Sequence, residues 1–185
     1  MNTPNWTAVQ CWDGSFVDIK PDNVFINYHP NNPEEDRFQD IKLGDFGDTY
    51  PIDAYGPSSG AFVGIPEWAS PEMMFELPWT TATDIWSFGA LLISLIYGGN
   101  FNLFAPQGPV ADLPEEQLAV LVQHYQWFGP FPKKFREIAR EDAMMVVERL
   151  EQEFTPEMTS LFRRISRKEV SSGDRDFLLR IMKLD

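Results

Sequence analysis

The sequence predicts a mixed α+β fold that is mainly α, with a short β-hairpin near its start and helices over the remainder. Three observations predict this. Two short apolar runs flank a polar loop in the first half, turn-forming residues crowd the segment that follows, and apolar residues recur at helical spacing after Thr83. The chain has 185 residues and is 43% hydrophobic, so one domain with one core is expected.

The first half contains the two predicted strands, Val24–Tyr28 and Asp40–Gly44. The loop between them, His29–Asp36, carries two prolines, two asparagines and three consecutive acidic residues. Such a loop is typical of a solvated hairpin tip, and an acidic interaction site is the alternative interpretation. The segment Thr49–Pro66 has Pro, Gly and Ser throughout, which predicts a long irregular loop of the kind that carries function.

Four helices are predicted in the second half. Asp84–Ile96 is apolar on every side, which predicts a central helix buried all round. The last helix is expected to begin after Gly173-Asp174, a suitable cap. Three segments show apolar residues at helical spacing: Glu115–Phe128, Lys133–Phe154 and Arg175–Leu184.

Composition excludes several classes of function. There are 15 Lys and Arg against 28 Asp and Glu, a net charge of −13, which argues against nucleic acid or an anionic membrane as partner. Cys11 is the only cysteine and there are two histidines, so neither an internal disulfide nor a Cys/His zinc set is expected. The most apolar run, Ile85–Tyr97, is shorter than the roughly 20 residues of a membrane span. We therefore expect a soluble, intracellular protein, cytoplasmic or nuclear.

Three short motifs stand in a fixed order. Asp18-Ile-Lys-Pro-Asp-Asn23 precedes the first predicted strand, and Asp45-Phe-Gly47 follows the second. Ser70-Pro-Glu72 then precedes Asp84-Ile-Trp-Ser-Phe-Gly89 at the head of the apolar helix. Each motif alone is weak, because short tripeptides and Pro at a helix start occur by chance. Their order, each in a matching structural context, is much more specific.

This arrangement resembles the C-terminal lobe of eukaryotic protein kinases of the Ser/Thr type. The resemblance covers about residues 16–185, so residues 1–15 are interpreted as a segment outside the family and 16–185 as a partial kinase domain. It rests on four stretches: V-D-I-K-P-D-N-V (Val17–Val24), L-G-D-F-G (Leu43–Gly47), G-I-P-E-W-A-S-P-E (Gly64–Glu72) and T-D-I-W-S-F-G (Thr83–Gly89).

The resemblance implies ATP and Mg²⁺ as cofactors, a protein substrate, and a cleft beside the short β-hairpin. By resemblance, Asp18 orients or accepts the proton of the acceptor hydroxyl, and Lys20 offers a positive charge to the γ-phosphate. Asn23 and Asp45 are the implied Mg²⁺ ligands, and hard oxygen donors suit that ion. We expect both side chains to converge on one metal position from neighbouring strand ends.

The resemblance also implies structural roles. Phe46 and Gly47 are implied to belong to the cofactor-binding site together with Asn23 and Asp45. Within it, Phe46 is expected to pack into the core, and Gly47 to allow a backbone turn closed to other residues. Asp84 is expected to hydrogen-bond backbone amides of the catalytic loop, and Trp86 and Phe88 are expected in the core.

The sequence also departs from the family pattern. Phe16-Val17 stand where the family has His-Arg, and Ile65 stands where Ser/Thr kinases have a Thr that hydrogen-bonds the catalytic Asp and Lys. Within the 185 residues there is no G-x-G-x-x-G loop and no V-A-I-K strand, so the N-terminal lobe is missing from them. Glu72 has no expected Arg partner in the chain.

Two interpretations from different classes remain open. The chain is either a truncated piece of a protein kinase whose complete form phosphorylates Ser or Thr, or a non-catalytic kinase-like (pseudokinase) module that binds proteins. Asp18, Lys20, Asn23 and Asp45 favour the first, and the departures favour the second. An unrelated α+β domain is a third, generic interpretation. The chain alone is expected to be a poor kinase.

Overall fold

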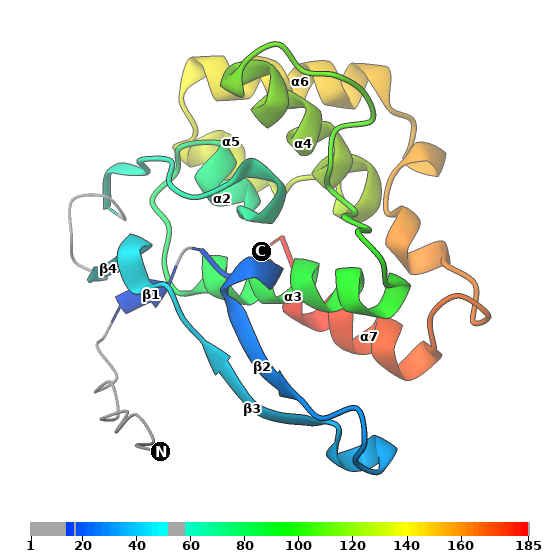
Figure 1. Cartoon of the computed structure of the whole chain (residues 1–185). Helices are drawn as coiled ribbons and strands as arrows, with labels where there is room; N and C mark the ends of the chain where they lie inside the picture. Colours follow the sequence, from blue (N-terminus) through cyan, green and yellow to red (C-terminus); the bar gives the residue numbers. More distant parts are fainter. Residues whose placement is uncertain (1–13, 17, 52–57, 185) are drawn as a thin grey trace.

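The computed structural model describes residues 14–16, 18–51 and 58–184 (Figure 1). The four strands within these residues form two separate antiparallel pairs: β1 (Gly14–Phe16) with β4 (Thr49–Pro51), and β2 (Val24–Tyr28) with β3 (Phe38–Leu43). The α-helices that lie wholly within the described residues are α2 (Pro71–Met74), α3 (Ala82–Tyr97), α4 (Leu113–Phe128), α5 (Lys133–Ile138), α6 (Glu141–Glu153) and α7 (Ser172–Ile181). The mainly helical fold with a small hairpin is therefore confirmed.

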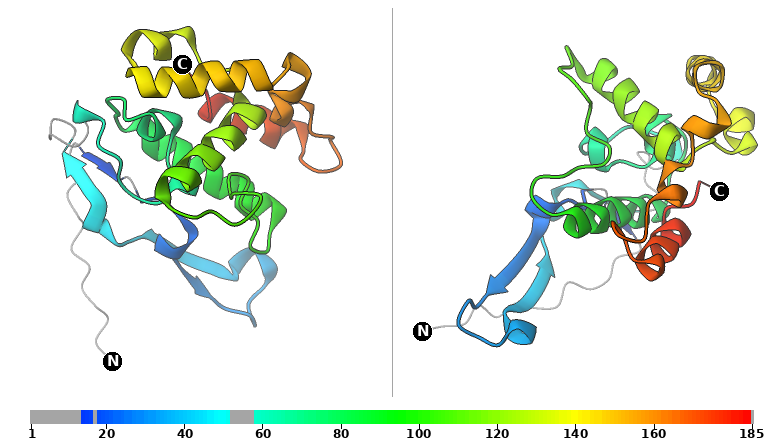
Figure 2. Two further views of the ribbon diagram at one scale, coloured as in Figure 1. Left: turned by 90° about the horizontal axis from the view of Figure 1, so that it is seen from above. Right: turned by 90° about the vertical axis from the view of Figure 1, so that its right-hand side faces the viewer.

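The β2–β3 hairpin extends away from the helices, as the views in Figures 1 and 2 agree. Cross-strand partners share a face of a sheet, and alternate residues along a strand do so too. Val24 pairs with Leu43 and Tyr28 with Phe38, whose rings lie 5.2 Å apart. One face of the hairpin thus consists of six apolar residues, five of them exposed, which we call the apolar hairpin face: Val24, Ile26, Tyr28, Phe38, Ile41 and Leu43.

Helix α3 forms the centre of the helical part, but it is not buried on every side. Trp86 and Ile93 are buried, as predicted, whereas Phe88 is 40% exposed and does not belong to the core. Leu95 is 65% exposed on the same outer surface. The prediction of complete burial was wrong because apolar composition cannot show which side of a helix its neighbours cover.

A glycine in α3 allows close packing against α7. A Cβ built on Gly89 would lie 2.5 Å from Cγ of Met182, closer than real Cβ atoms approach a neighbour. Helix α7 itself begins earlier than predicted, at Ser172, and ends at Ile181. The Oγ of Ser171 accepts a hydrogen bond from the Asp174 amide at 3.2 Å, so Ser171, and not Gly173-Asp174, caps the helix.

The predicted helix 133–154 is in fact two helices. Helix α5 ends at Ile138, and the extended residues Ala139 and Arg140 separate it from α6. Glu141 and Asp142 then occupy the first turn of α6, where the partial positive charge of a helix N-terminus favours carboxylates. Helical spacing continues across the break, which explains why the sequence pattern did not show it.

The turn after α2 places a glutamate in a conformation that favours glycine. Glu76 has φ 51°, and the amide of Glu76 bonds Met73 O while that of Leu77 bonds Glu72 O, the pattern that ends many helices in a left-handed residue. A residue with a side chain costs roughly 1–2 kcal/mol there relative to its preferred conformation. The turn holds Gly60 close, since a Cβ on Gly60 would lie 2.0 Å from Glu76 O.

The main core contains an aromatic cluster that surrounds a histidine. His124 of α4 is fully buried, and its ring centroid lies 4.4 Å from that of Phe104 and 5.0 Å from that of Trp86, both in edge-on geometry. Phe128 completes the cluster, 5.5 Å from Trp86.

Among the described helices, none is both long and apolar enough to span a bilayer.

Candidate active site

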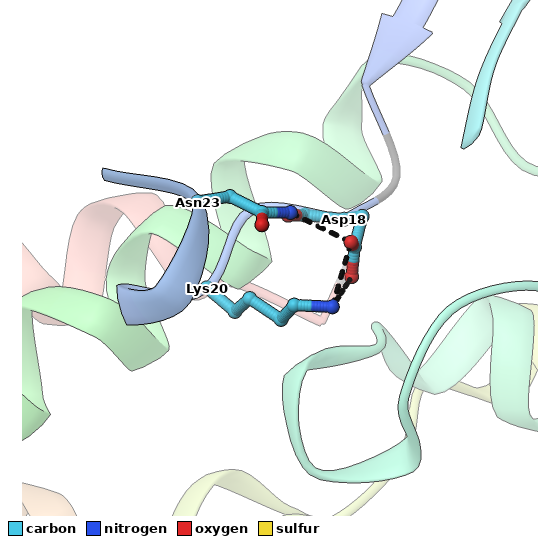
Figure 3. A network of polar contacts seen from close by, with 3 residues as sticks. All are labelled: Asp18, Lys20 and Asn23. Carbon is cyan, nitrogen blue, oxygen red and sulfur yellow. Dashed lines mark hydrogen bonds and ion pairs between the residues drawn. The ribbon is translucent and has the colours of Figure 1, made fainter. Parts of the chain in front are cut away.

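The segment between β1 and β2 forms a compact loop that brings three predicted site residues together. Pro21 begins a short 3₁₀ turn, Pro21–Asn23, and the Asn23 amide bonds Lys20 O at 3.1 Å. This turn reverses the chain, so that the side chain of Asn23 points back at Asp18 (Figure 3). Proline suits the first position of such a turn because its fixed φ is already helical and it has no amide to satisfy.

Asp18 lies at the centre of this array and is only 6% exposed. Nζ of Lys20 donates to both carboxylate oxygens of Asp18, at 2.8 and 2.7 Å. Nδ2 of Asn23 donates to Oδ2 of Asp18 at 2.6 Å and to its backbone oxygen at 2.8 Å. A buried carboxylate needs such charged and polar partners, because removing it from water is otherwise costly.

Two properties follow from this geometry. The side-chain amide of Asn23 holds the Asp18 carboxylate in one orientation. Lys20, whose side chain is also mostly buried, balances the negative charge of that carboxylate. The ammonium group of Lys20 is carried on a flexible side chain and has three N–H donors. It can therefore move from Asp18 to bind another anion nearby. An oriented carboxylate beside a movable cation suits proton acceptance next to a phosphoryl group.

Asp45 follows the end of β3 and sits at the same end of the hairpin as Asn23. The Gly44 amide bonds Asn23 O at 2.9 Å, so the residue preceding Asp45 is tied to Asn23 through the backbone. Asp45 itself is in the left-handed region, with φ 57°. This conformation is tolerated best by Gly, Asn and Asp, and it marks the point where β3 turns into the 3₁₀ turn Phe46–Asp48.

Two expectations for this turn were wrong. Phe46 is 49% exposed and does not belong to the buried core. The residue that needs the unusual backbone conformation is Asp45, since Gly47 is not among the residues with positive φ. A Cβ on Gly47 would lie 3.4 Å from Oδ1 of Asp45, an ordinary contact distance, so packing does not require glycine there either.

The donors at this end of the hairpin fit a Mg²⁺ ion that is shared with phosphates. Because Nδ2 of Asn23 faces Asp18, its Oδ1 points away from that residue (Figure 3). Asp45 contributes a carboxylate, and its carboxylate forms no ion pair with a described residue. Over the part of the chain that is described, no three His, Cys, Asp or Glu side chains gather into a metal cage. One amide and one carboxylate are the few protein ligands that Mg²⁺ takes when phosphates supply the rest.

Buried hydroxyl groups that the sequence analysis did not single out hold the third motif in place. Oγ1 of Thr83 donates to Oγ of Ser70 at 2.8 Å. Oγ of Ser87 donates to Trp68 O at 2.7 Å, which fixes the segment before α2 onto α3. The signal in the sequence was the presence of Thr83 and Ser87 in an otherwise apolar helix, since buried hydroxyls require partners.

Glu67 in the same segment lies against the acidic start of α4. Burial raises the pKa of the Glu67 carboxyl, and the nearby Glu116 carboxylate raises it further. Ile65, two residues before Glu67, is 38% exposed. Glu72 in α2 forms no ion pair with any described residue. The hydrogen bonds expected for Asp84 stay a prediction, and Val17 lies outside the described residues.

Comparison with known sequences decides the family. The sequence profile of the protein kinase domain matches residues 15–172. The chain belongs to the protein kinase domain family. The match includes every residue of the array around Asp18, the Asp45 turn and the third motif, and it confirms the resemblance on which their roles were inferred.

Individual Ser/Thr kinases are similar over part of this kinase domain. Serine/threonine-protein kinase Nek2 of Homo sapiens is 38% identical over 78 residues, which is 42% of this chain and 16% of that protein. Serine/threonine-protein kinase PAK 5 of Rattus norvegicus is 36% identical over 81 residues, or 44% of this chain and 10% of that protein. Serine/threonine-protein kinase US3 of Human herpesvirus 1 (strain 17) is 32% identical over 123 residues, 63% of this chain and 24% of that protein. The chain therefore matches between about a tenth and a quarter of the length of these relatives.

Proposed function

We propose that this domain supplies the catalytic-loop half of a Ser/Thr kinase site, which transfers the γ-phosphoryl group of ATP to a hydroxyl of a protein. The single observation that carries the proposal is the buried Asp18 carboxylate, held by Lys20 and Asn23 in one array. The names of the Ser/Thr kinases to which the chain is similar support the same reaction class.

Each residue of the array has a proposed task. The acceptor hydroxyl donates its hydrogen bond to Asp18, whose orientation is set by the two bonds from Asn23. The hydroxyl oxygen bonds to phosphorus while the bond between phosphorus and the ADP oxygen breaks. In the same step the proton of the acceptor hydroxyl passes to the Asp18 carboxylate. Lys20 moves from Asp18 toward the transferring group and balances its negative charge. Asn23 and Asp45 hold Mg²⁺, which supplies positive charge to the phosphates.

We expect the 185-residue chain by itself to transfer phosphate slowly. It contains no glycine-rich loop and no strand lysine of the kind that position ATP in kinases. Small misplacements of reacting groups cost about a hundredfold or more in rate. The rate of the isolated chain should therefore lie at least about a hundredfold below the roughly 1–100 s⁻¹ of complete kinases.

The alternative proposal is a non-catalytic kinase-like module that binds proteins. Ile65 supports it, because an apolar side chain cannot hydrogen-bond Asp18 or Lys20 from the position of the family's Thr. Phe16-Val17 support it as well, because they leave no Arg to bind a phosphorylated loop.

Labelled phosphate transfer from ATP to a mixed Ser/Thr protein substrate distinguishes these proposals. The Asp18→Asn variant keeps the size of the side chain and removes the proton acceptor, and Asp22→Asn on the exposed side of the same turn is the matched control. We expect a slow transfer that Asp18→Asn abolishes and Asp22→Asn preserves. Equal background in all three proteins would refute the catalytic proposal and favour the binding module. Transfer at the rate of a complete kinase would refute the prediction of a slow lobe.

A further inference from the structure

A groove of about 270 Å³ lies between α2, α4 and α6. It lies on the side of α3 opposite the β2–β3 hairpin, in the upper part of Figure 1, where these helices are gathered. Its floor is apolar and is formed by buried or half-buried side chains: Met74, Phe75, Leu118, Leu121 and Val146. The groove is therefore separate from the array around Asp18 and of a size that accepts one or two apolar side chains.

The rim of the groove carries two carboxylates that share one cation. Nη1 of Arg140 lies 3.0 Å from Oε2 of Glu76, and Nε of Arg140 lies 3.8 Å from Oδ1 of Asp142. All three side chains are more than half exposed. Exposed ion pairs of this kind are weak, so the guanidinium can leave without a large loss.

The surroundings of the groove are acidic beyond these two residues. Glu115 and Glu116 lie in the first turn of α4, next to the groove residue Pro114, and Glu141 lies in the first turn of α6. Arg140 alone does not balance these carboxylates. The local charge favours a ligand that brings positive charge of its own.

The backbone at Glu76 gives a separate reason to regard its side chain as functional. Its left-handed conformation, with φ 51°, completes the turn after α2 through backbone bonds that a glycine would make with less strain. The turn therefore does not require the carboxylate, which instead stands at the rim of the groove. Strained residues of this kind are often retained for binding.

We propose that the groove binds a short segment of a partner protein that presents an apolar side chain between arginine or lysine residues. The apolar side chain enters the groove over Leu118 and Leu121, and the flanking cations take the place of Arg140 on Glu76 and Asp142. The proposal goes beyond the phosphoryl transfer proposed above and does not depend on it, since the groove is separate from Asp18.

Fluorescence anisotropy with a defined peptide tests the proposal. The probe is a labelled ten-residue peptide with two adjacent leucines between two pairs of arginines and glycine-serine ends. The comparison peptides replace the arginines by glutamates, or the leucines by serines. Saturable binding of the first peptide, at least tenfold tighter than that of either comparison peptide and weakened by salt, is the expected result.

Four variants of the full chain locate the binding site. Glu76→Gly removes a rim carboxylate while relieving the backbone, so it should weaken peptide binding at least fivefold without lowering the unfolding midpoint. Arg140→Ala removes the cation that competes with the peptide arginines for Glu76 and Asp142, so it should strengthen binding severalfold. Glu34→Gln at the hairpin tip changes the net charge by the same amount as Glu76→Gly and should leave binding unchanged. Ile41→Ser alters the apolar hairpin face and should also leave it unchanged.

Several results would overturn the proposal. Absence of saturable binding at millimolar peptide excludes a docking groove of this chemistry. Equal weakening by Glu34→Gln and Glu76→Gly shows attraction to the net charge alone. Loss of binding in Ile41→Ser, with normal binding in Glu76→Gly, places the peptide on the hairpin instead.

Discussion

The buried His124 makes the stability of this domain sensitive to acid. Its imidazole is completely buried among Trp86, Phe104 and Phe128, and neither ring nitrogen has a hydrogen-bond partner among the described residues. Burial lowers the pKa of His124 from 6.5 to about 3. The folded protein therefore keeps the ring neutral at pH values at which the unfolded chain protonates it.

The direction and size of the effect follow from this difference. Because the pKa is lower in the folded state, the stabilising contribution is present above pH 6.5 and is lost as the pH falls toward 3. At about 1.4 kcal/mol per pH unit, the whole interval of 6.5 to about 3 corresponds to about 5 kcal/mol. Between pH 7 and pH 5 the contribution of His124 to the free energy of unfolding falls by about 2 kcal/mol. Small domains have about 5–15 kcal/mol of stability, so this loss is measurable.

Urea unfolding at pH 7 and pH 5, followed by tryptophan fluorescence, measures the loss, and His124→Leu is the test variant. Leucine is of similar size and does not titrate, so the variant should lack the loss of about 2 kcal/mol. Protonation of Glu67, whose pKa is raised, acts in the opposite direction, and the difference between the two proteins removes this contribution. Equal loss of stability in both proteins between pH 7 and pH 5 would refute the reasoning.

Two further predictions concern the helix and the hairpin. Ile93→Ala should lower the free energy of unfolding by about 2–5 kcal/mol, because Ile93 of α3 is completely buried. Leu95→Ala, at a position that is 65% exposed, should change it by less than about 0.5 kcal/mol, and similar losses in both variants would contradict the described burial of α3. The apolar hairpin face should promote self-association of the isolated chain, so Ile41→Glu should reduce it in sedimentation velocity without lowering stability. Unchanged association in that variant would assign the contact to another surface.

Much of the architecture was predictable because it rests on local patterns. The hairpin strands, Val24–Tyr28 and Phe38–Leu43, lie within two residues of their predicted bounds, since short apolar runs around a loop with proline and asparagine specify this unit. Helix α4 begins at Leu113 and ends at Phe128, close to prediction, because Asp112 caps it and Pro114 starts it. Motif order also led to the kinase family, which the profile match confirmed.

The candidate site was predictable in part. The spacing of Asp18, Lys20 and Asn23 suggested one loop, and the structure brings their side chains together. The shared Mg²⁺ position of Asn23 and Asp45 stays a prediction. Sequence reasoning missed the hydroxyl groups of Ser70, Thr83 and Ser87, because their partners come from segments that are distant along the chain.

The sequence by itself determined most of the elements, the family and the residues that carry the proposed chemistry, because periodicity, turn residues and motif order act over short distances. It did not show the break between α5 and α6 or strand β4. Only the tertiary structure decided which of the apolar residues are covered. Phe46 and Phe88 read as core from their motifs, yet both are at least 40% exposed. Burial is a property of the neighbours that pack against a residue, and the neighbours of His124 or of Arg140 come together only when helices from separate parts of the chain meet.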